Sequence, residues 1–201
     1  MNFLGLVAHT MGYGDSGAAL SVDGHIVGLI EEERFSRKRY DDSFPKKSIS
    51  HLLKIGGISG QDIRIVTFHL LSWRGLGTRI YWAARHPISV ASNSGEYFRC
   101  ASKLRHMKGE IQEALGHKQF NVEFYRHHLC HAAASFYPSP FETSAYMTLD
   151  GSGETITGSI GVASRKKGFK ILQNIHYPHS LGCAYAAVSD YIGFPPPAGP
   201  A

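Results

Sequence analysis

Short apolar segments separated by glycine-rich turns fill the first thirty residues, and this alternation constrains the fold more than any other feature. The apolar segments cover Phe3–Ala8, Ala18–Val22 and His25–Ile30. Asp23 and Gly24 connect the last two segments, and an Asp-Gly pair is a strong signal for a two-residue hairpin turn. The sequence therefore predicts that the chain opens with a β-meander.

Beyond the meander, strand and helix patterns alternate. Helical spacing of apolar residues predicts helices over Lys46–Ile55, Leu104–Leu115 and Leu181–Ile192. Strand patterns cover Ile63–Leu71, Asn121–Tyr125, Ser144–Leu149, Thr155–Ala163 and Phe169–Tyr177. A meander followed by alternating strands and helices, and then by further strands, predicts an α/β fold with a mixed sheet. The basic segment 72–117 has no clear strand pattern, and we expect a helical insertion there.

Length and composition describe an ordinary globular chain. Its 201 residues, 43% of them apolar and 18% charged, suffice for one good-sized domain with a buried core. The sequence contains no run of eighteen apolar residues, and the first residues lack the basic region and cleavage site of a secretion signal. Cys100, Cys130 and Cys183 are too scattered for a disulfide framework. We expect a protein of the reducing cytoplasm that does not cross a membrane.

A positive net charge points to anionic partners. The formal charge is +5 at pH 7 with histidine neutral, which suits phosphorylated small molecules, nucleotides or nucleic acid. The segment between Arg74 and Lys108 combines basic side chains with Trp82, which is one pattern for stacking on bases. A surface subdomain with apolar anchors explains the same residues, so we do not expect nucleic acid as the partner.

The most specific chemical pattern is a histidine pair followed by an aspartate. His127 and His131 are four residues apart, so a helix presents both imidazoles on one face. Asp150 follows the predicted strand that ends at Leu149. Two histidines and one carboxylate form the facial set that holds iron and other divalent metals. A surface or capping role explains an isolated pair of this spacing as well. We expect His128 to belong to the core or to support a metal ligand without binding the metal, because it lies on a different side of the helix.

Two glycine-containing turns are candidate phosphate sites. Asp150-Gly151-Ser152-Gly153 offers backbone N–H groups between two strands, and the earlier turn that contains Ser16 does the same. Hairpin turns use the same residue types for geometry alone, so either turn by itself is weak evidence. The cationic residues from Arg34 to Arg39 follow three glutamates. They suit either a self-compensating charged turn or a clamp for a phosphate or carboxylate.

Taken together and in order, these motifs identify a family resemblance. The chain is similar to the antibiotic and nodulation-factor O-carbamoyltransferases in its residues 14–20, 23–24, 31–38, 127–133, 150–154 and 180–194. The resemblance runs from end to end of the chain, except for residues 72–117, which are not diagnostic. It implies that residues 1–201 form an incomplete amino-terminal domain with the actin-like ATPase, or ribonuclease H-like, fold.

The resemblance also implies a reaction. Members of the family make a carbamoyl-adenylate from ATP and carbamoyl phosphate in a carboxy-terminal domain, and the amino-terminal domain passes the carbamoyl group to a hydroxyl of a small-molecule acceptor such as a sugar or an antibiotic. The family's metal matches His127, His131 and Asp150, with iron expected and zinc or manganese as alternatives. Ser16, Gly151, Ser152 and Gly153 are expected to contact ATP or the carbamoyl-adenylate.

Two positions depart from the family pattern. The histidine that activates the acceptor hydroxyl is replaced by Gly14, next to Asp15, and His9 on the same loop is the candidate substitute. A lysine of the family pattern is replaced by Arg39, which keeps the charge but transfers no proton. We expect His9, Asp15 and Arg39 to be catalytic. Since the family continues beyond residue 201, we also expect a separate carboxy-terminal half. The alternatives are a non-catalytic module that binds a metal or nucleotide, or an inactive truncated fragment.

Overall fold

The computed structural model describes residues 1–8, 16–69, 84, 106–153 and 155–194. Two compact units contain these residues: one holds 1–68 and 106–124, and the other holds 69, 84 and 125–194. His9, Gly14, Asp15 and most of the expected insertion over 72–117 lie outside the described residues. No helix of the described chain is long and apolar enough to span a membrane.

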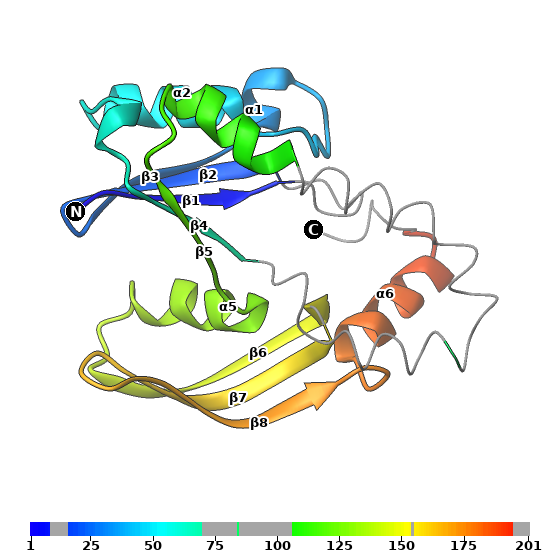
Figure 1. Ribbon diagram of the computed structural model, residues 1–201. Coiled ribbons are helices and arrows are strands. Elements are labelled where there is room, and N and C mark those ends of the chain that lie inside the picture. Colours follow the sequence, from blue (N-terminus) through cyan, green and yellow to red (C-terminus); the bar gives the residue numbers. More distant parts are fainter. Residues whose placement is uncertain (9–15, 70–83, 85–105, 154, 195–201) are drawn as a thin grey trace. The chain divides into compact units, whose positions relative to one another are not determined.

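A five-stranded mixed sheet forms the centre of the first unit (Figure 1). The strand order is β3-β2-β1-β4-β5; β2 is antiparallel to both of its neighbours, whereas β1, β4 and β5 are parallel. The strands are β1 (Phe3–Val7), β2 (Gly17–Val22), β3 (His25–Glu31), β4 (Ile65–Phe68) and β5 (Asn121–Phe124). The mixed α/β class expected from the sequence is confirmed.

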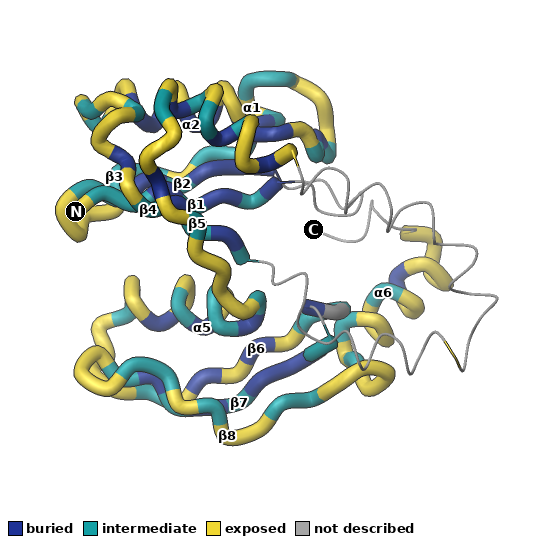
Figure 2. Tube along the Cα trace, in the orientation of Figure 1, coloured by how far each residue is buried: buried dark blue, intermediate teal, exposed yellow. Residues whose placement is uncertain are grey.

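Helix α2 packs on this sheet, and the charged segment that follows β3 forms a short helix of its own. α2 (Lys46–Ile55) buries Ile49, Leu52 and Leu53 against β2 and β3, and Figure 2 shows both buried and exposed stretches along this helix. The predicted bounds of this helix are confirmed. The charged segment after β3 forms the short helix α1 (Glu33–Ser36), a 3-10 turn spans Gly60–Asp62, and residues 106–115 are helical.

Glu32 caps α2 from outside the helix. Pro45 stands at the N-cap position and has no side-chain oxygen to accept a hydrogen bond. The Glu32 carboxylate, 4% exposed, instead accepts hydrogen bonds from the backbone N–H groups of Lys47 and Ser48 at 3.1 and 2.9 Å and from the Ser48 hydroxyl at 2.7 Å. The middle glutamate of the motif therefore has a structural role, since it satisfies donors at the start of the helix.

The second unit is an antiparallel sheet with helices α5 and α6 against it (Figure 1). The strand order is β6-β7-β8. Its elements are α5 (His127–Phe136), β6 (Thr143–Gly153), β7 (Ile156–Ser164), β8 (Gly168–His176) and α6 (Leu181–Tyr191). Ala132 and Phe136 of α5 pack on Tyr146 and Ala163 to form the core of this unit.

Strand β6 differs from the prediction at one informative place. The sequence predicts that the strand ends at Leu149, but β6 continues to Gly153, with a shift of register against β7 between these two residues. Asp150 therefore lies in an irregular stretch of the strand instead of beyond its end. Bulged strands re-aim side chains in this way next to functional sites.

Candidate metal centre

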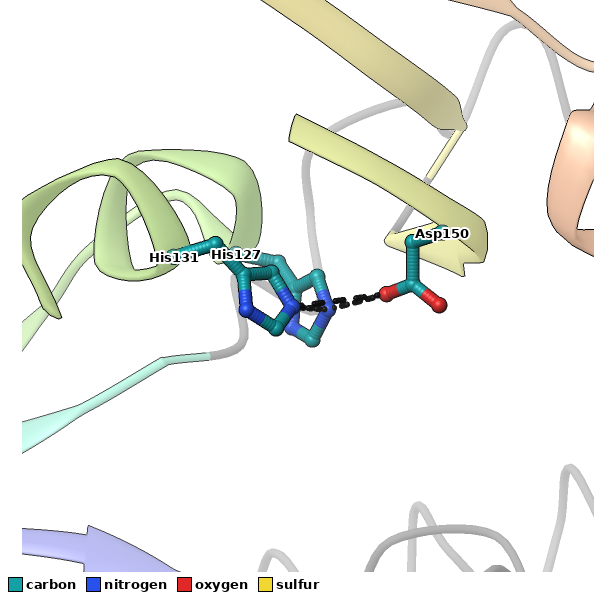
Figure 3. Close-up of side chains that lie close together, drawn as sticks. All are labelled: His127, His131 and Asp150. Atoms are coloured by element: carbon teal, nitrogen blue, oxygen red, sulfur yellow. Dashed lines mark hydrogen bonds and ion pairs between the residues drawn. The ribbon is translucent and has the colours of Figure 1, made fainter. Parts of the chain in front are cut away.

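Helix α5 presents the predicted histidine pair from consecutive turns. The Nε2 atoms of His127 and His131 are 2.9 Å apart, and their rings are nearly perpendicular, with centroids 4.5 Å apart. Figure 3 shows both rings directed toward the Asp150 carboxylate. The predicted i, i+4 geometry is therefore present in the folded chain.

Asp150 completes the cluster from β6. Its Oδ2 lies 2.6 Å from His127 Nε2 and 3.5 Å from His131 Nε2, and its Oδ1 accepts a hydrogen bond from the Gly151 N–H at 2.6 Å. The side chains of His127, His131 and Asp150 are 20%, 52% and 35% exposed. The cluster is therefore partly buried and reachable from solvent on the His131 side.

The carboxylate of Asp150 is held in its charged form. Its pKa lies well below the usual range of an aspartate, first because His127 hydrogen-bonds to it and then because His131 does, and these effects outweigh the desolvation that burial causes. An ionised oxygen beside two imidazole nitrogens is the donor set that divalent transition metals prefer.

The distances within the cluster fit a shared metal ion. The three ligand atoms of His127, His131 and Asp150 all lie within 4.8 Å of one another. Neighbouring ligand atoms around an octahedral ion with bonds of about 2.1 Å are about 3 Å apart. His127 Nε2 also faces both His131 Nε2 and Asp150 Oδ2, and a single ring N–H cannot donate well to both. A cation between the three atoms satisfies all of them.

His128 fixes the helix that carries the pair. It is 4% exposed, and its Nε2 and Nδ1 lie 2.8 Å from the Ile156 carbonyl oxygen and the Thr148 hydroxyl, respectively. Because a carbonyl only accepts, Nε2 carries the proton and Nδ1 accepts from Thr148. Burial lowers the pKa of His128, which favours this neutral form. The expected core role of His128 is confirmed: it ties α5 to β6 and β7.

Gly153 makes room for the His127 ring. A Cβ at this position would lie 2.3 Å from His127 Cδ2, so a side chain there would displace the imidazole. Gly151 is engaged through its backbone, since its N–H bonds to Asp150 Oδ1 and its carbonyl accepts from Ser180 Oγ at 2.8 Å. Ser152 lies within β6. The expected contacts of Gly151, Ser152 and Gly153 with a nucleotide stay predictions.

The other two described site candidates belong to the first unit. Ser16 is 2% exposed; its N–H bonds to the Asp41 carbonyl at 3.3 Å, and its hydroxyl donates to the Ser43 carbonyl. Arg39 is exposed, and its guanidinium lies 4.9 Å from the centroid of the Tyr40 ring. The expected roles of Ser16 in cofactor binding and of Arg39 in catalysis stay predictions, as do those of His9 and Asp15.

Sequence reasoning missed two neighbours of the cluster. The ring of His69 lies 5.4 Å from that of His127, centroid to centroid. The hydroxyl of Ser180 reaches the Asp150 carbonyl oxygen at 3.0 Å. Neither residue carries a local metal-binding pattern, because both come close to the cluster only through the tertiary fold. Ser180 does stand at the start of a predicted helix, which signals a cap but not a contact with Asp150.

Comparison with known proteins extends these observations. The chain is 36% identical over 203 residues to the uncharacterized protein sll1178 of Synechocystis, covering 96% of this chain and 32% of the relative. It is 28% identical to the nodulation protein NolNO of Sinorhizobium fredii, covering 90% of this chain and 25% of the relative. The chain thus spans about a quarter to a third of the length of these relatives.

Among solved structures, YeaZ from Pseudomonas aeruginosa is similar, with a TM-score of 0.45 and 14% identity over 86% of this chain and 64% of that one. A model of the carbamoyltransferase N-terminus family matches residues 3–200, nearly the whole chain. The chain therefore belongs to the carbamoyltransferase N-terminus family.

Proposed function

We propose that this chain is the metal-holding part of an O-carbamoyltransferase. In this proposal it passes a carbamoyl group from a carbamoyl-adenylate, made from carbamoyl phosphate and ATP with release of phosphate and pyrophosphate, to a hydroxyl of a small-molecule acceptor such as a sugar. The acceptor oxygen bonds to the carbamoyl carbon, the bond from that carbon to the adenylate oxygen breaks, and AMP leaves. The observation that carries the proposal is the convergence of His127, His131 and Asp150 in a member of the carbamoyltransferase N-terminus family. A carboxy-terminal half that makes the carbamoyl-adenylate is the proposed partner of this chain.

The donor set supports a divalent metal as the cofactor. His127, His131 and Asp150 would hold it, with iron favoured by the pairing of two imidazoles with one carboxylate and with zinc or manganese as alternatives. Such an ion supplies positive charge that polarises a carbonyl or phosphoryl oxygen. The partial exposure of His131 supports access by a substrate from solvent.

The remaining site residues have proposed roles other than metal binding. Arg39, exposed and permanently cationic, is suited to an anionic phosphate or adenylate group. Ser16, Gly151, Ser152 and Gly153 are proposed to contact the nucleotide, and His9 is proposed to accept the proton of the acceptor hydroxyl next to Asp15. A cytoplasmic location completes the proposal, since ATP and carbamoyl phosphate are cytoplasmic compounds.

A metal-binding experiment tests the cofactor. The purified chain is titrated without oxygen with Fe²⁺, Zn²⁺ and Mn²⁺, and bound metal is counted by mass spectrometry. We expect about one ion per chain, lost in the His127→Ala/His131→Ala variant. The matched control is His25→Ala/His176→Ala, which removes two exposed histidines outside the cluster. Equal metal content in the cluster variant and the control would contradict the proposal.

A transfer experiment tests the reaction. The metal-loaded chain is incubated with ¹³C-labelled carbamoyl phosphate, ATP and a panel of sugars, with and without the carboxy-terminal part of a longer relative. We expect labelled carbamoyl sugar only when metal and the added part are both present. Metal binding with no product in either case would favour a second candidate, a non-catalytic metal-binding module.

A further inference from the structure

The start of α6 lies directly against the backbone of the metal-binding aspartate. A Cβ on Gly182 would come within 2.4 Å of both the Asp150 carbonyl carbon and the Gly151 nitrogen. Real Cβ atoms do not approach backbone so closely, so any side chain at this position would force the helix and the Asp150 turn apart. Because Gly182 has no side chain, the first turn of α6 packs on the peptide that follows Asp150.

Ser180 links the same helix to the same peptide by hydrogen bonds. Its hydroxyl lies 3.0 Å from the Asp150 carbonyl oxygen and 2.8 Å from that of Gly151, and it accepts the Cys183 N–H at 3.0 Å. The Cys183 thiol adds a weaker contact to the Gly151 carbonyl at 3.4 Å. One hydroxyl thus caps α6 and holds the irregular end of β6.

These contacts bear on the orientation of the carboxylate. Past the register shift at Leu149, β6 has no regular pairing until Gly153, so the ladder does not fix Asp150. The α6 contacts hold its main chain instead, and the Gly151 N–H holds Oδ1. Oδ2 is then left directed at the two histidine rings, as Figure 3 shows.

We infer that Ser180 and Gly182 are positioning residues of the metal centre, which fix Asp150 Oδ2 toward His127 and His131 without touching the ion. This inference rests on the metal proposed above. Residues that orient a metal ligand typically change metal affinity by about 10- to 100-fold when they are substituted. We expect effects of this size from changes at α6, although no side chain of that helix belongs to the three-residue cluster.

Substitutions at Ser180 separate positioning from helix capping. Glycine is tolerated at an N-cap with little loss of helix stability but has no hydroxyl, whereas threonine keeps both the cap and the donor. We therefore expect Ser180→Gly to weaken binding of Mn²⁺ or Zn²⁺ about tenfold with a melting temperature close to that of the wild type, and Ser180→Thr to restore affinity. Ser189→Ala, at a buried position of the same helix, is the control and should bind as the wild type does.

Substitution at Gly182 tests the close approach. We expect Gly182→Ala to weaken metal binding by about 10- to 100-fold and to change the visible spectrum of the Co²⁺-loaded chain, which reports coordination geometry. Gly109→Ala is the matched control, because it adds the same methyl group to another helix where a Cβ would meet no atom within 4 Å. Unchanged affinity and an unchanged Co²⁺ spectrum in both Ser180→Gly and Gly182→Ala would overturn the inference.

A measurement on the metal-free chain distinguishes the two proposals. The ¹⁵N resonances of the His127 and His131 rings report their hydrogen bonds to Asp150 directly. We expect Gly182→Ala to shift them and Gly109→Ala to leave them unchanged. If the wild type bound no metal and these shifts still occurred, the metal proposal would fail, but Ser180 and Gly182 would still orient Asp150 toward the histidines. If the wild type bound metal and neither the shifts nor the affinity changed, the positioning role alone would fail.

Discussion

The polar side chains around α2 and those between α5 and β6 are used in opposite ways. Around α2, the side chains of Glu32, Asp41 and Ser16 are buried. They form hydrogen bonds with backbone groups or with neighbouring serines. Between α5 and β6, His127, His131 and Asp150 are partly exposed and face one another across short distances. Side chains that satisfy a backbone stabilise a fold, whereas donor atoms that converge on one point are suited to a ligand.

A conspicuous acidic residue in a sequence can stabilise the backbone or face a ligand, and the sequence pattern alone does not distinguish the two roles. The glutamates after β3 are as conspicuous in the sequence as the aspartate in β6. Glu32 nevertheless accepts three hydrogen bonds at the start of α2, whereas Asp150 keeps one oxygen for the histidines. Replacing the carboxylate by an amide should therefore mainly weaken metal binding at Asp150 and mainly lower stability at Glu32.

Asp150→Asn is expected to have the largest effect. It removes the charge and leaves an amide where the proposed metal would bind an anionic oxygen, so we expect metal affinity to fall by more than the roughly 100-fold upper end that is typical of merely supporting residues. In the metal-free chain we also expect a loss of about 1 kcal/mol in the free energy of unfolding, because the charged carboxylate hydrogen-bonds to His127 but is partly exposed. Calorimetric metal titration and urea unfolding measure the two quantities. If the variant bound metal as the wild type does, Asp150 would not be a metal ligand.

Glu32→Gln is expected to show the reverse pattern. The amide nitrogen would face an N–H or O–H donor where the carboxylate accepts one, and an unsatisfied buried donor costs about 1–3 kcal/mol. We expect a loss of about 2 kcal/mol in the free energy of unfolding with unchanged metal affinity. Urea unfolding followed by circular dichroism measures the loss. An equally stable variant with weakened metal binding would contradict the structural role of Glu32.

Asp41 adds a pH dependence to the same region. Hydrogen bonds from Ser36 and Ser43 lower the pKa of its carboxyl to about 2 from 3.8. The charged form is therefore favoured by the fold, so its contribution is complete above about pH 4 and is lost as pH falls through about 2. We expect Asp41→Asn to lower stability by about 1.5 kcal/mol at pH 7.

Unfolding curves of wild type and Asp41→Asn between pH 7 and pH 3 test this sign. The difference between the two proteins should be constant near neutrality and should shrink below about pH 4. A difference that grew as the pH fell would show that the fold favours the protonated carboxyl instead.

Arg34→Ala is expected to have the smallest effect, and it gives a reference value for the stability changes of the other variants. Its guanidinium pairs with Glu31 at 3.2 Å, but the arginine side chain is 70% exposed, and exposed pairs contribute about 0–1 kcal/mol. We expect a change in unfolding free energy below about 0.5 kcal/mol and no change in metal binding. A loss as large as that of Glu32→Gln would mean that the charged motif acts as a single network.

Local patterns in the sequence predicted much of the fold. Helix α2 has the bounds that its apolar spacing predicts, and α6 ends one residue before the predicted end. The meander over β1–β3 follows from the alternation of its residues and from the Asp23-Gly24 turn. These features are decided by periodicity and turn chemistry within a few residues, which is why a sequence reveals them.

Contacts between distant residues were not predictable in the same way. The histidine pair and Asp150 were found because their types and spacing imply chemistry, but the bulge that aims Asp150 was not. The cap that Glu32 provides joins residues 16 positions apart, and the contact of Ser180 with Asp150 joins residues 30 positions apart. Such contacts depend on how elements pack, which no local pattern encodes.

X-ray absorption spectroscopy of the metal-loaded chain shows whether His127, His131 and Asp150 hold the ion, because the spectrum identifies the atoms bound to it. We expect scattering from two imidazole rings, with nitrogen at about 2.1 Å, together with oxygen, and we expect the imidazole signal to disappear in His127→Ala/His131→Ala. A first shell that contained sulfur, or that lacked imidazole in the wild type, would contradict this expectation.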